Sequence, residues 1–189
     1  MRTATVLLFV AALVAGCSSS GGDGTHVAIP DAGQVFPNLT LQGLRSVATL
    51  ETEDTVSTWE DFDPDGLRYD LLHVMAICLW CPHCNNETTN IAQIAAWQAD
   101  HHVAVLQIAI QGYSGASPTW PEIQKWAQDH DVSFPVLIDG QAAKLGQSFN
   151  VSSVPLNIMV NPRTMAVLAI DLGEVGDVEA YEQGFLNRP

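Results

Sequence analysis

Apolar residues along this chain gather in short runs, and between the runs they recur every three or four positions. Short apolar runs predict buried strands, and a recurrence every three or four residues predicts helices that pack by one face. The runs that predict strands are Leu71–Cys78, Val103–Ile110 and Phe134–Ile138. The segments that predict helices run from Pro82 to about Asp100, from Trp120 to His130, from Ala142 to Phe149 and from Asp177 to Leu186. Strands that alternate with helices indicate an α/β fold.

The pattern changes near the C-terminus. Leu156–Val160 and Met165–Ile170 flank the turn sequence Asn161-Pro162-Arg163, and together they predict a β-hairpin. A hairpin adds antiparallel strands, so we expect a mixed sheet rather than a purely parallel one. Residues 36–189 are sufficient for one compact domain with its own core.

The N-terminal segment predicts export. Arg2 is followed by the apolar stretch Val6–Val14, which is too short to span a bilayer. Leu13-Val14-Ala15-Gly16-Cys17 then resembles the lipobox of bacterial lipoproteins, which implies removal of residues 1–16 and lipidation of Cys17. Residues 17–35 begin with a run of Ser and Gly and predict a flexible tether. The alternative is an ordinary signal peptide that a cysteine happens to follow.

This interpretation places the domain in the bacterial cell envelope. A lipid on Cys17 would hold it on a membrane surface, facing the periplasm or the exterior, without a spanning helix. Ser18 after the cysteine favours the outer membrane. The formal net charge of −14 argues against nucleic acid as a partner and against electrostatic docking on anionic lipid.

Three of the four cysteines lie close together: Cys78, Cys81 and Cys84. Clustered cysteines indicate a reactive site rather than a set of structural disulfides. Cys81 and Cys84 form a CxxC pair behind a predicted strand, with Pro82 as the first residue of the helix and Cys81 at its N-cap. A helix N-terminus stabilises a thiolate, which is what dithiol–disulfide chemistry requires. The same spacing also occurs in zinc sites and in static disulfides.

Several segments in the same order resemble the thioredoxin superfamily, and within it the membrane-anchored TlpA/ResA-type thiol–disulfide oxidoreductases, with the redoxins and peroxiredoxins as neighbours. They are Phe36–Leu41 as an entry strand, Trp59–Phe62, Trp80–Glu87, Phe134–Asp139 and Phe149–Pro162. The resemblance covers about Phe36 to Ile170. It implies a thioredoxin-like fold with an N-terminal β extension and exchange of disulfides with protein thiols. It also implies that the only redox group is the Cys81–Cys84 disulfide, with no other cofactor and no metal. The resemblance further implies a redox partner at the membrane or outside the cytoplasm, but it does not indicate which protein that partner is.

The resemblance assigns roles to single residues. Cys81 is expected to be the nucleophile, and Cys84 the resolving cysteine, less exposed and one turn further along the helix. Glu87 matches the acid that takes a proton from the resolving cysteine in TlpA/ResA-type proteins, with a pKa raised by burial. The alternative for Glu87 is an exposed acid in the first turns of a helix.

Other residues are expected to tune the dithiol or hold the substrate. Pro82 and His83 resemble the pair between the two cysteines of the oxidase DsbA, whereas the rest of the chain resembles a branch that often reduces its substrates. The sequence therefore leaves open whether the protein oxidises or reduces its substrates. His83 could also be a solvent-facing residue without such a role. Trp80 is expected to shield one side of the dithiol. Pro155 is expected to be cis and to leave the backbone of Val154 free for an extended peptide; an ordinary trans proline is the alternative.

The sequence departs from the family pattern at three positions. The buried acid that thioredoxin itself carries on the strand would fall near Met75 and is absent. Leu156 stands where a Thr often follows the cis-proline, and Thr89 replaces a helix-kinking Pro. Cys78 is expected to be a buried, unreactive thiol, although its spacing superficially resembles an iron–sulfur run. The remaining histidines show no ligand spacing and are expected on the surface or at strand ends: His26, His73, His101, His102 and His130. Two rival functions remain, a thiol peroxidase and a Sco-like copper-binding module.

Overall fold

A computed structural model describes residues 34–45, 50, 53–62 and 68–187. The predicted signal peptide, Cys17, His26 and all of the predicted tether except its last two residues lie outside these ranges. Within the described residues, no helix is both long and apolar enough to cross a membrane.

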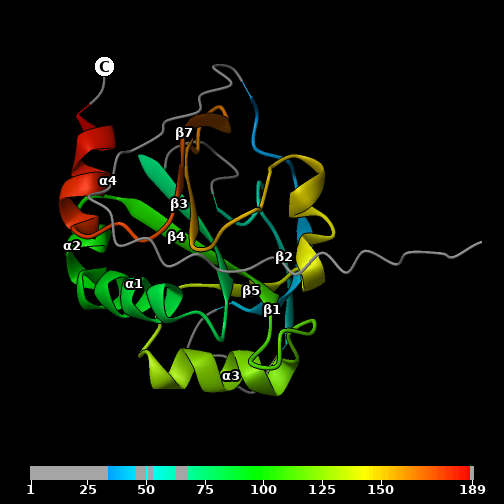
Figure 1. The fold of residues 1–189 in the computed structure, drawn as a ribbon. Coiled ribbons are helices and arrows are strands. Elements are labelled where there is room, and N and C mark those ends of the chain that lie inside the picture. The colour runs from blue at the N-terminus through cyan, green and yellow to red at the C-terminus, as the bar shows by residue number, and fades with distance from the viewer. Residues whose placement is uncertain (1–33, 46–49, 51–52, 63–67, 188–189) are drawn as a thin grey trace, which may run out of the picture.

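Seven strands form one mixed sheet in the described part of the chain (Figure 1). They are β1 (Thr40–Leu44), β2 (Asp54–Ser57), β3 (Leu71–Cys78), β4 (Val103–Gln111), β5 (Val136–Ile138), β6 (Leu156–Asn161) and β7 (Ala166–Leu172). The order across the sheet is β2-β1-β5-β4-β3-β6-β7. β3, β4 and β5 are parallel, and all other pairs are antiparallel. The predicted mixed α/β sheet is confirmed.

Strand β3 lies near the centre of this sheet, and all eight of its residues are buried. A strand covered on both faces has no solvent-facing positions, which is why its sequence is almost continuously apolar. The predicted bounds Leu71–Cys78 coincide with the observed ones. The carboxyl end of β3 therefore leads from the core directly to the CxxC pair, Cys81 and Cys84.

Four helices are described: α1 (Pro82–Gln93), α2 (Ala95–Asp100), α3 (Trp120–Asp129) and α4 (Val178–Leu186). The connections β3–α1–β4 and β4–α3–β5 step in the same direction across the sheet, and crossovers of one hand place α1 and α3 on the same face. α4 packs against α1 and β3 on that face. The segment between β5 and β6, which contains short 3₁₀ turns, lies on the other side of the sheet in Figure 1.

Two predicted helices differ from the structure. The helix predicted from Pro82 to about Asp100 is broken at Ile94, whose N–H donates to the carbonyl of Ile91, only three residues back, at 3.2 Å. The helix predicted for Ala142–Phe149 is replaced by 3₁₀ turns at Gly140–Ala142 and Leu145–Gln147. Gln141 and Ala142 have φ of 59° and 52°, and these left-handed conformations cannot continue a right-handed helix.

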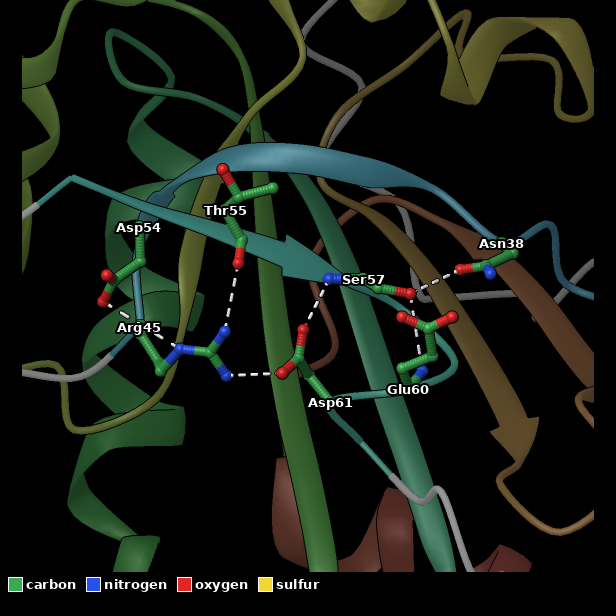
Figure 2. A network of polar contacts seen from close by, with 7 residues as sticks. All are labelled: Asn38, Arg45, Asp54, Thr55, Ser57, Glu60 and Asp61. Carbon is green, nitrogen blue, oxygen red and sulfur yellow. Dashed lines mark hydrogen bonds and ion pairs between the residues drawn. The ribbon is translucent and has the colours of Figure 1, made fainter.

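Strands β1 and β2 are the predicted N-terminal β extension, which is confirmed, although β1 starts at Thr40 rather than at Phe36, where the entry strand was expected to begin. Arg45 at the end of β1 holds the hairpin: its guanidinium contacts Asp61 at 2.6 Å and the Thr55 carbonyl at 3.0 Å. Asp61 in turn accepts from the N–H of Ser57 at 2.6 Å. Figure 2 shows this network continuing from Ser57 to Asn38. The contacts explain how two short strands at the sheet edge are fixed.

The described chain enters the domain beside the β6–β7 turn. Val35 forms a bridge with Ala166, supported by hydrogen bonds from Phe36 N–H to the Met165 carbonyl and from Val167 N–H to the Gln34 carbonyl. Ala166 pairs with Asn161 at the far end of β6. The entry point therefore lies at the end of the sheet where β3 begins.

Candidate active site

The two cysteines of the CxxC pair lie where β3 passes into α1. Cys81 is the N-cap of α1, and Pro82 is its first residue, as predicted. Cys81 is 5% exposed, and Cys84, one turn inside the helix, is fully buried. Both are free thiols in this structure. The strand brings Cys81 to the positive end of the helix, and helical spacing places the second thiol beneath it.

The two thiols have opposite acidities. A hydrogen bond from the Cys84 thiol, and the backbone N–H groups of Cys84 and His83, lower the pKa of Cys81 to about 6, against the opposing effect of burial. Burial is the main reason why the pKa of Cys84 is raised far above its ordinary value. At neutral pH the outer sulfur is therefore a thiolate, and the inner sulfur remains a thiol that stabilises it.

A loop far away in sequence packs on the dithiol. The Val154–Pro155 peptide bond is cis, as expected, and Pro155 is buried. The Cys81 sulfur lies 3.8 Å from the Val154 carbonyl oxygen, to which it donates when it is protonated. The structure thus brings the loop with Val154 and Pro155 to Cys81, and the alternative of an ordinary trans proline is wrong.

Glu87 is fully buried, so the alternative of an exposed helix acid is wrong. It lies three residues after Cys84, which puts the two side chains on one face of α1. Neither carboxylate oxygen has a hydrogen-bond partner among the described residues. Burial raises the pKa of Glu87 to about 8, and the nearby ring of His73 opposes this rise. A carboxyl group with such a pKa can take up or release a proton near neutral pH.

His83 and Trp80 form the rim of the site. His83 is exposed, and its Nδ1 lies 2.7 Å from a carboxylate oxygen of Glu174, which raises the pKa of the imidazole. Trp80 is 39% exposed and donates its indole N–H to Gln111 at 2.9 Å. The same oxygen of Gln111 lies 3.6 Å from the sulfur of Cys78, which is buried at the end of β3.

One expectation about the histidines is wrong. His73 is neither on the surface nor at a strand end: it lies within β3 and is fully buried. Glu182 of α4 and Asn157 of β6 hydrogen-bond to its two ring nitrogens. Sequence reasoning missed this group because its partners lie 84 and 109 residues away. A polar residue inside an otherwise apolar run was the one available signal.

Comparison with known sequences identifies the family. The sequence model of the AhpC/TSA family matches residues 32–169, which is more than half of the chain. The protein belongs to the AhpC/TSA family. Cys81, Cys84, Glu87 and the cis-proline all fall within the part that matches the AhpC/TSA family. No curated protein matches the sequence.

Solved structures share the fold of this AhpC/TSA family protein. The thioredoxin domain of a thiol–disulfide oxidoreductase from Bacteroides vulgatus is 18% identical, with a TM-score of 0.61, covering 82% of this chain and 98% of its own. A thioredoxin-family thiol:disulfide interchange protein from Chlorobium tepidum is 14% identical, with a TM-score of 0.59 and coverages of 82% and 98%. A DsbF homologue from Corynebacterium diphtheriae is 22% identical, with a TM-score of 0.56 and coverages of 86% and 92%. The thioredoxin-like fold implied by the sequence is confirmed.

Proposed function

We propose that this protein is a thiol–disulfide oxidoreductase that works outside the cytoplasm and exchanges disulfides with other proteins through Cys81 and Cys84. The observation that carries the proposal is the opposite acidity of two thiols one helical turn apart. An acidic outer thiol supplies the nucleophile, and a buried inner thiol can attack only after losing its proton. The similar structures from Bacteroides vulgatus and Chlorobium tepidum are a thiol–disulfide oxidoreductase and a thiol:disulfide interchange protein, which agrees with this chemistry.

The reaction follows from the positions of the groups. The Cys81 thiolate attacks one sulfur of a substrate disulfide, which forms a mixed disulfide and releases the first substrate thiolate. Glu87 then accepts the proton of Cys84, and the Cys84 thiolate attacks the Cys81 sulfur. The Cys81–Cys84 disulfide forms, and the second substrate sulfur leaves as a thiolate that takes a proton from water. Two electrons pass from the dithiol to the substrate, and the reverse sequence oxidises a dithiol.

The substrate is expected to lie along the backbone next to the cis-proline. Pro155 has no N–H, so the polypeptide at this point presents carbonyl groups beside the Cys81 sulfur. Trp80, the residue before Cys81, gives an exposed aromatic surface on which a peptide can pack. These contacts hold an extended peptide with its disulfide near Cys81.

The proposed location rests on the N-terminal sequence. The lipobox-like segment before Cys17 supports a lipid anchor on the surface of a bacterial membrane, with the domain in the periplasm or outside the cell. Labelling of cells with a radioactive fatty acid tests this. The wild-type protein should be labelled, and Cys17→Ser should not; equal labelling of both removes the anchor from the proposal.

The central experiment is a redox titration of residues 36–189. The pKa of about 6 for Cys81 lies between the values of about 7 for thioredoxin and about 3.5 for DsbA. We therefore expect a reduction potential between about −270 and −120 mV, accompanied by reduction of insulin disulfides. Peroxide turnover and copper content are measured on the same preparation. Fast peroxide consumption without insulin reduction would support the rival peroxidase, and stoichiometric copper would support the Sco-like module.

The His83–Glu174 pair is expected to make the dithiol more oxidising. Glu174 keeps the imidazole protonated, and the resulting positive charge stabilises the Cys81 thiolate. His83→Gln and Glu174→Gln should each raise the pKa of Cys81 by roughly half a unit and make the potential more negative. Thiolate absorbance at 240 nm against pH measures the first effect. Arg163→Gln, which removes an exposed ion pair with Asp70 at the opposite end of β6, is the control. Unchanged thiolate titrations in both rim variants would remove the pair from the mechanism.

A further inference from the structure

The buried histidine of β3 belongs to a closed polar cluster under the active-site helix. His73 Nδ1 lies 2.8 Å from Glu182, and His73 Nε2 lies 2.8 Å from the side-chain oxygen of Asn157. Gln98 donates to both carboxylate oxygens of Glu182 at 2.9 and 3.0 Å. His73 and Glu182 are both fully buried. The four residues come from β3, β6, α2 and α4, so the cluster is built by tertiary packing.

The hydrogen bonds determine the charge of the ring. The Asn157 amide N–H donates to the Gly173 carbonyl at 3.1 Å, so the Asn157 oxygen must accept from His73 Nε2. On the other side Glu182 already accepts from Gln98, as an ionised carboxylate does, and it can therefore also accept from Nδ1. With both nitrogens donating, the ring is an imidazolium ion. His73 and Glu182 form a buried ion pair.

This ion pair lies next to Glu87. After burial, the charge of His73 is the largest influence on Glu87, and Glu87 in turn favours the protonated ring. Asn157 is close to both groups and links them. No group makes a hydrogen bond to the Glu87 carboxylate oxygens among the described residues. The Val175 N–H and the Asn157 side chain favour the charged carboxylate less than the positive ring does, so the ring is its main stabilising partner.

Other titratable groups surround this pair of sites. They lie on α1, on β7, in the segment before α4 and on α4: His83, Cys84, Asp171, Glu174, Tyr181 and Glu182. Glu174 disfavours a negative charge at Glu87, whereas His73 favours it. Removing the positive charge of the His73 ring therefore raises the pKa of Glu87.

We propose that the buried His73–Glu182 ion pair controls the protonation of Glu87 and so sets the pH range in which Cys84 resolves the mixed disulfide. The inference rests on the proposed role of Glu87 as the proton acceptor. His73 and Glu182 do not touch the reacting sulfurs, so they are positioning residues that act through Glu87. The proton still passes from the Cys84 sulfur to the Glu87 carboxylate, and the ion pair alters how readily that carboxylate is available.

The test follows resolution directly. The reduced protein is mixed with 5,5′-dithiobis(2-nitrobenzoate), and release of the second thionitrobenzoate reports the attack of Cys84 on the Cys81 mixed disulfide. In the wild type we expect the rate to rise with pH to a midpoint near the pKa of Glu87, about 8. His73→Gln and Glu182→Gln should each move this midpoint upward by about one pH unit and slow resolution about tenfold at pH 7.

A matched control separates electrostatics from packing. Gln107 is equally buried on the same face of the sheet and bonds Thr88 and Trp126, but it carries no charge. Gln107→Met should lower thermal stability and leave the pH midpoint in place. If the single changes at the ion pair prevent folding, His73→Met combined with Glu182→Leu leaves no unpaired buried charge and should show the same upward shift.

The outcomes separate the role of the ion pair from the role of Glu87. A midpoint that moves in His73→Gln and Glu182→Gln but not in Gln107→Met supports the inference. A midpoint that disappears in Glu87→Gln yet stays unmoved in both ion-pair variants overturns the inference alone. An unchanged midpoint in Glu87→Gln itself overturns the role of Glu87 and the inference with it.

Discussion

Replacing Cys81 by serine should reduce insulin reduction to the uncatalysed background. Cys81 carries the acidic thiol at the helix N-terminus, and a serine hydroxyl in the same place stays protonated and cannot attack a disulfide. Insulin turbidity with dithiothreitol as electron donor measures the loss. Cys84→Ser should instead trap substrate on Cys81, because no second thiol is left to release it, and this covalent complex can be seen by mass spectrometry.

Cys78→Ser is the matched control for both changes. Cys78 is buried at the end of β3, and a serine hydroxyl can make the same contact with Gln111 that the thiol makes. We expect nearly wild-type activity and an unchanged potential. Disulfide exchange that survives in Cys81→Ser, or that is lost in Cys78→Ser, would show that the nucleophile has been assigned to the wrong sulfur.

Glu87→Gln should slow resolution of the mixed disulfide about a hundredfold or more at neutral pH, as expected for loss of a general base. The amide has nearly the same shape but cannot accept the proton of Cys84, whose own pKa is strongly raised by burial. Formation of the mixed disulfide at Cys81 should change little. Stopped-flow measurement of the two phases separates these steps, with the exposed acid variant Asp100→Asn as the control. Equal slowing of both phases would contradict a specific role in resolution.

Glu87 also makes stability depend on pH. Burial raises the pKa of Glu87 from 4.5 to about 8, so the folded protein binds this proton more tightly than the unfolded chain does. The resulting contribution to the free energy of unfolding is fully present below about pH 4.5 and is lost as the pH rises through about 8, an effect of the order of 5 kcal/mol at most. Urea unfolding across this range should show Glu87→Gln gaining stability relative to the wild type as the pH increases.

Local patterns in the sequence predicted the elements that carry the site. Leu71–Cys78 is buried on both faces, and an almost uninterrupted apolar run of this length is typical of such a strand. Pro82 fixes the start of α1 because its missing N–H costs nothing at that position. Asp177, the first residue of the predicted helix, is the N-cap of α4, and its side chain accepts from the Ala180 N–H.

Tertiary contacts account for what the sequence did not reveal. The break at Ile94 has no Gly or Pro beside it to indicate it, and the left-handed conformation of Gln141 and Ala142, just after Gly140, is not a preference of either residue type. The burial of Glu87 could be decided only by knowing what packs on α1. His73 looked unremarkable because each of its partners comes from a different, later segment of the chain, and no spacing rule connects them.

The bridge between Val35 and Ala166 determines which end of the domain would face the membrane if the protein is tethered through its N-terminal segment. Cys81 follows the end of β3, whereas this bridge lies beside the start of that strand, and eight strand residues span roughly 26 Å. A lipid-bearing segment joined at Gln34 would therefore be attached at the end of the sheet opposite to Cys81. Substrate proteins could then reach Cys81 and Cys84 from the side that faces away from the membrane, without displacing the tether or approaching the bilayer.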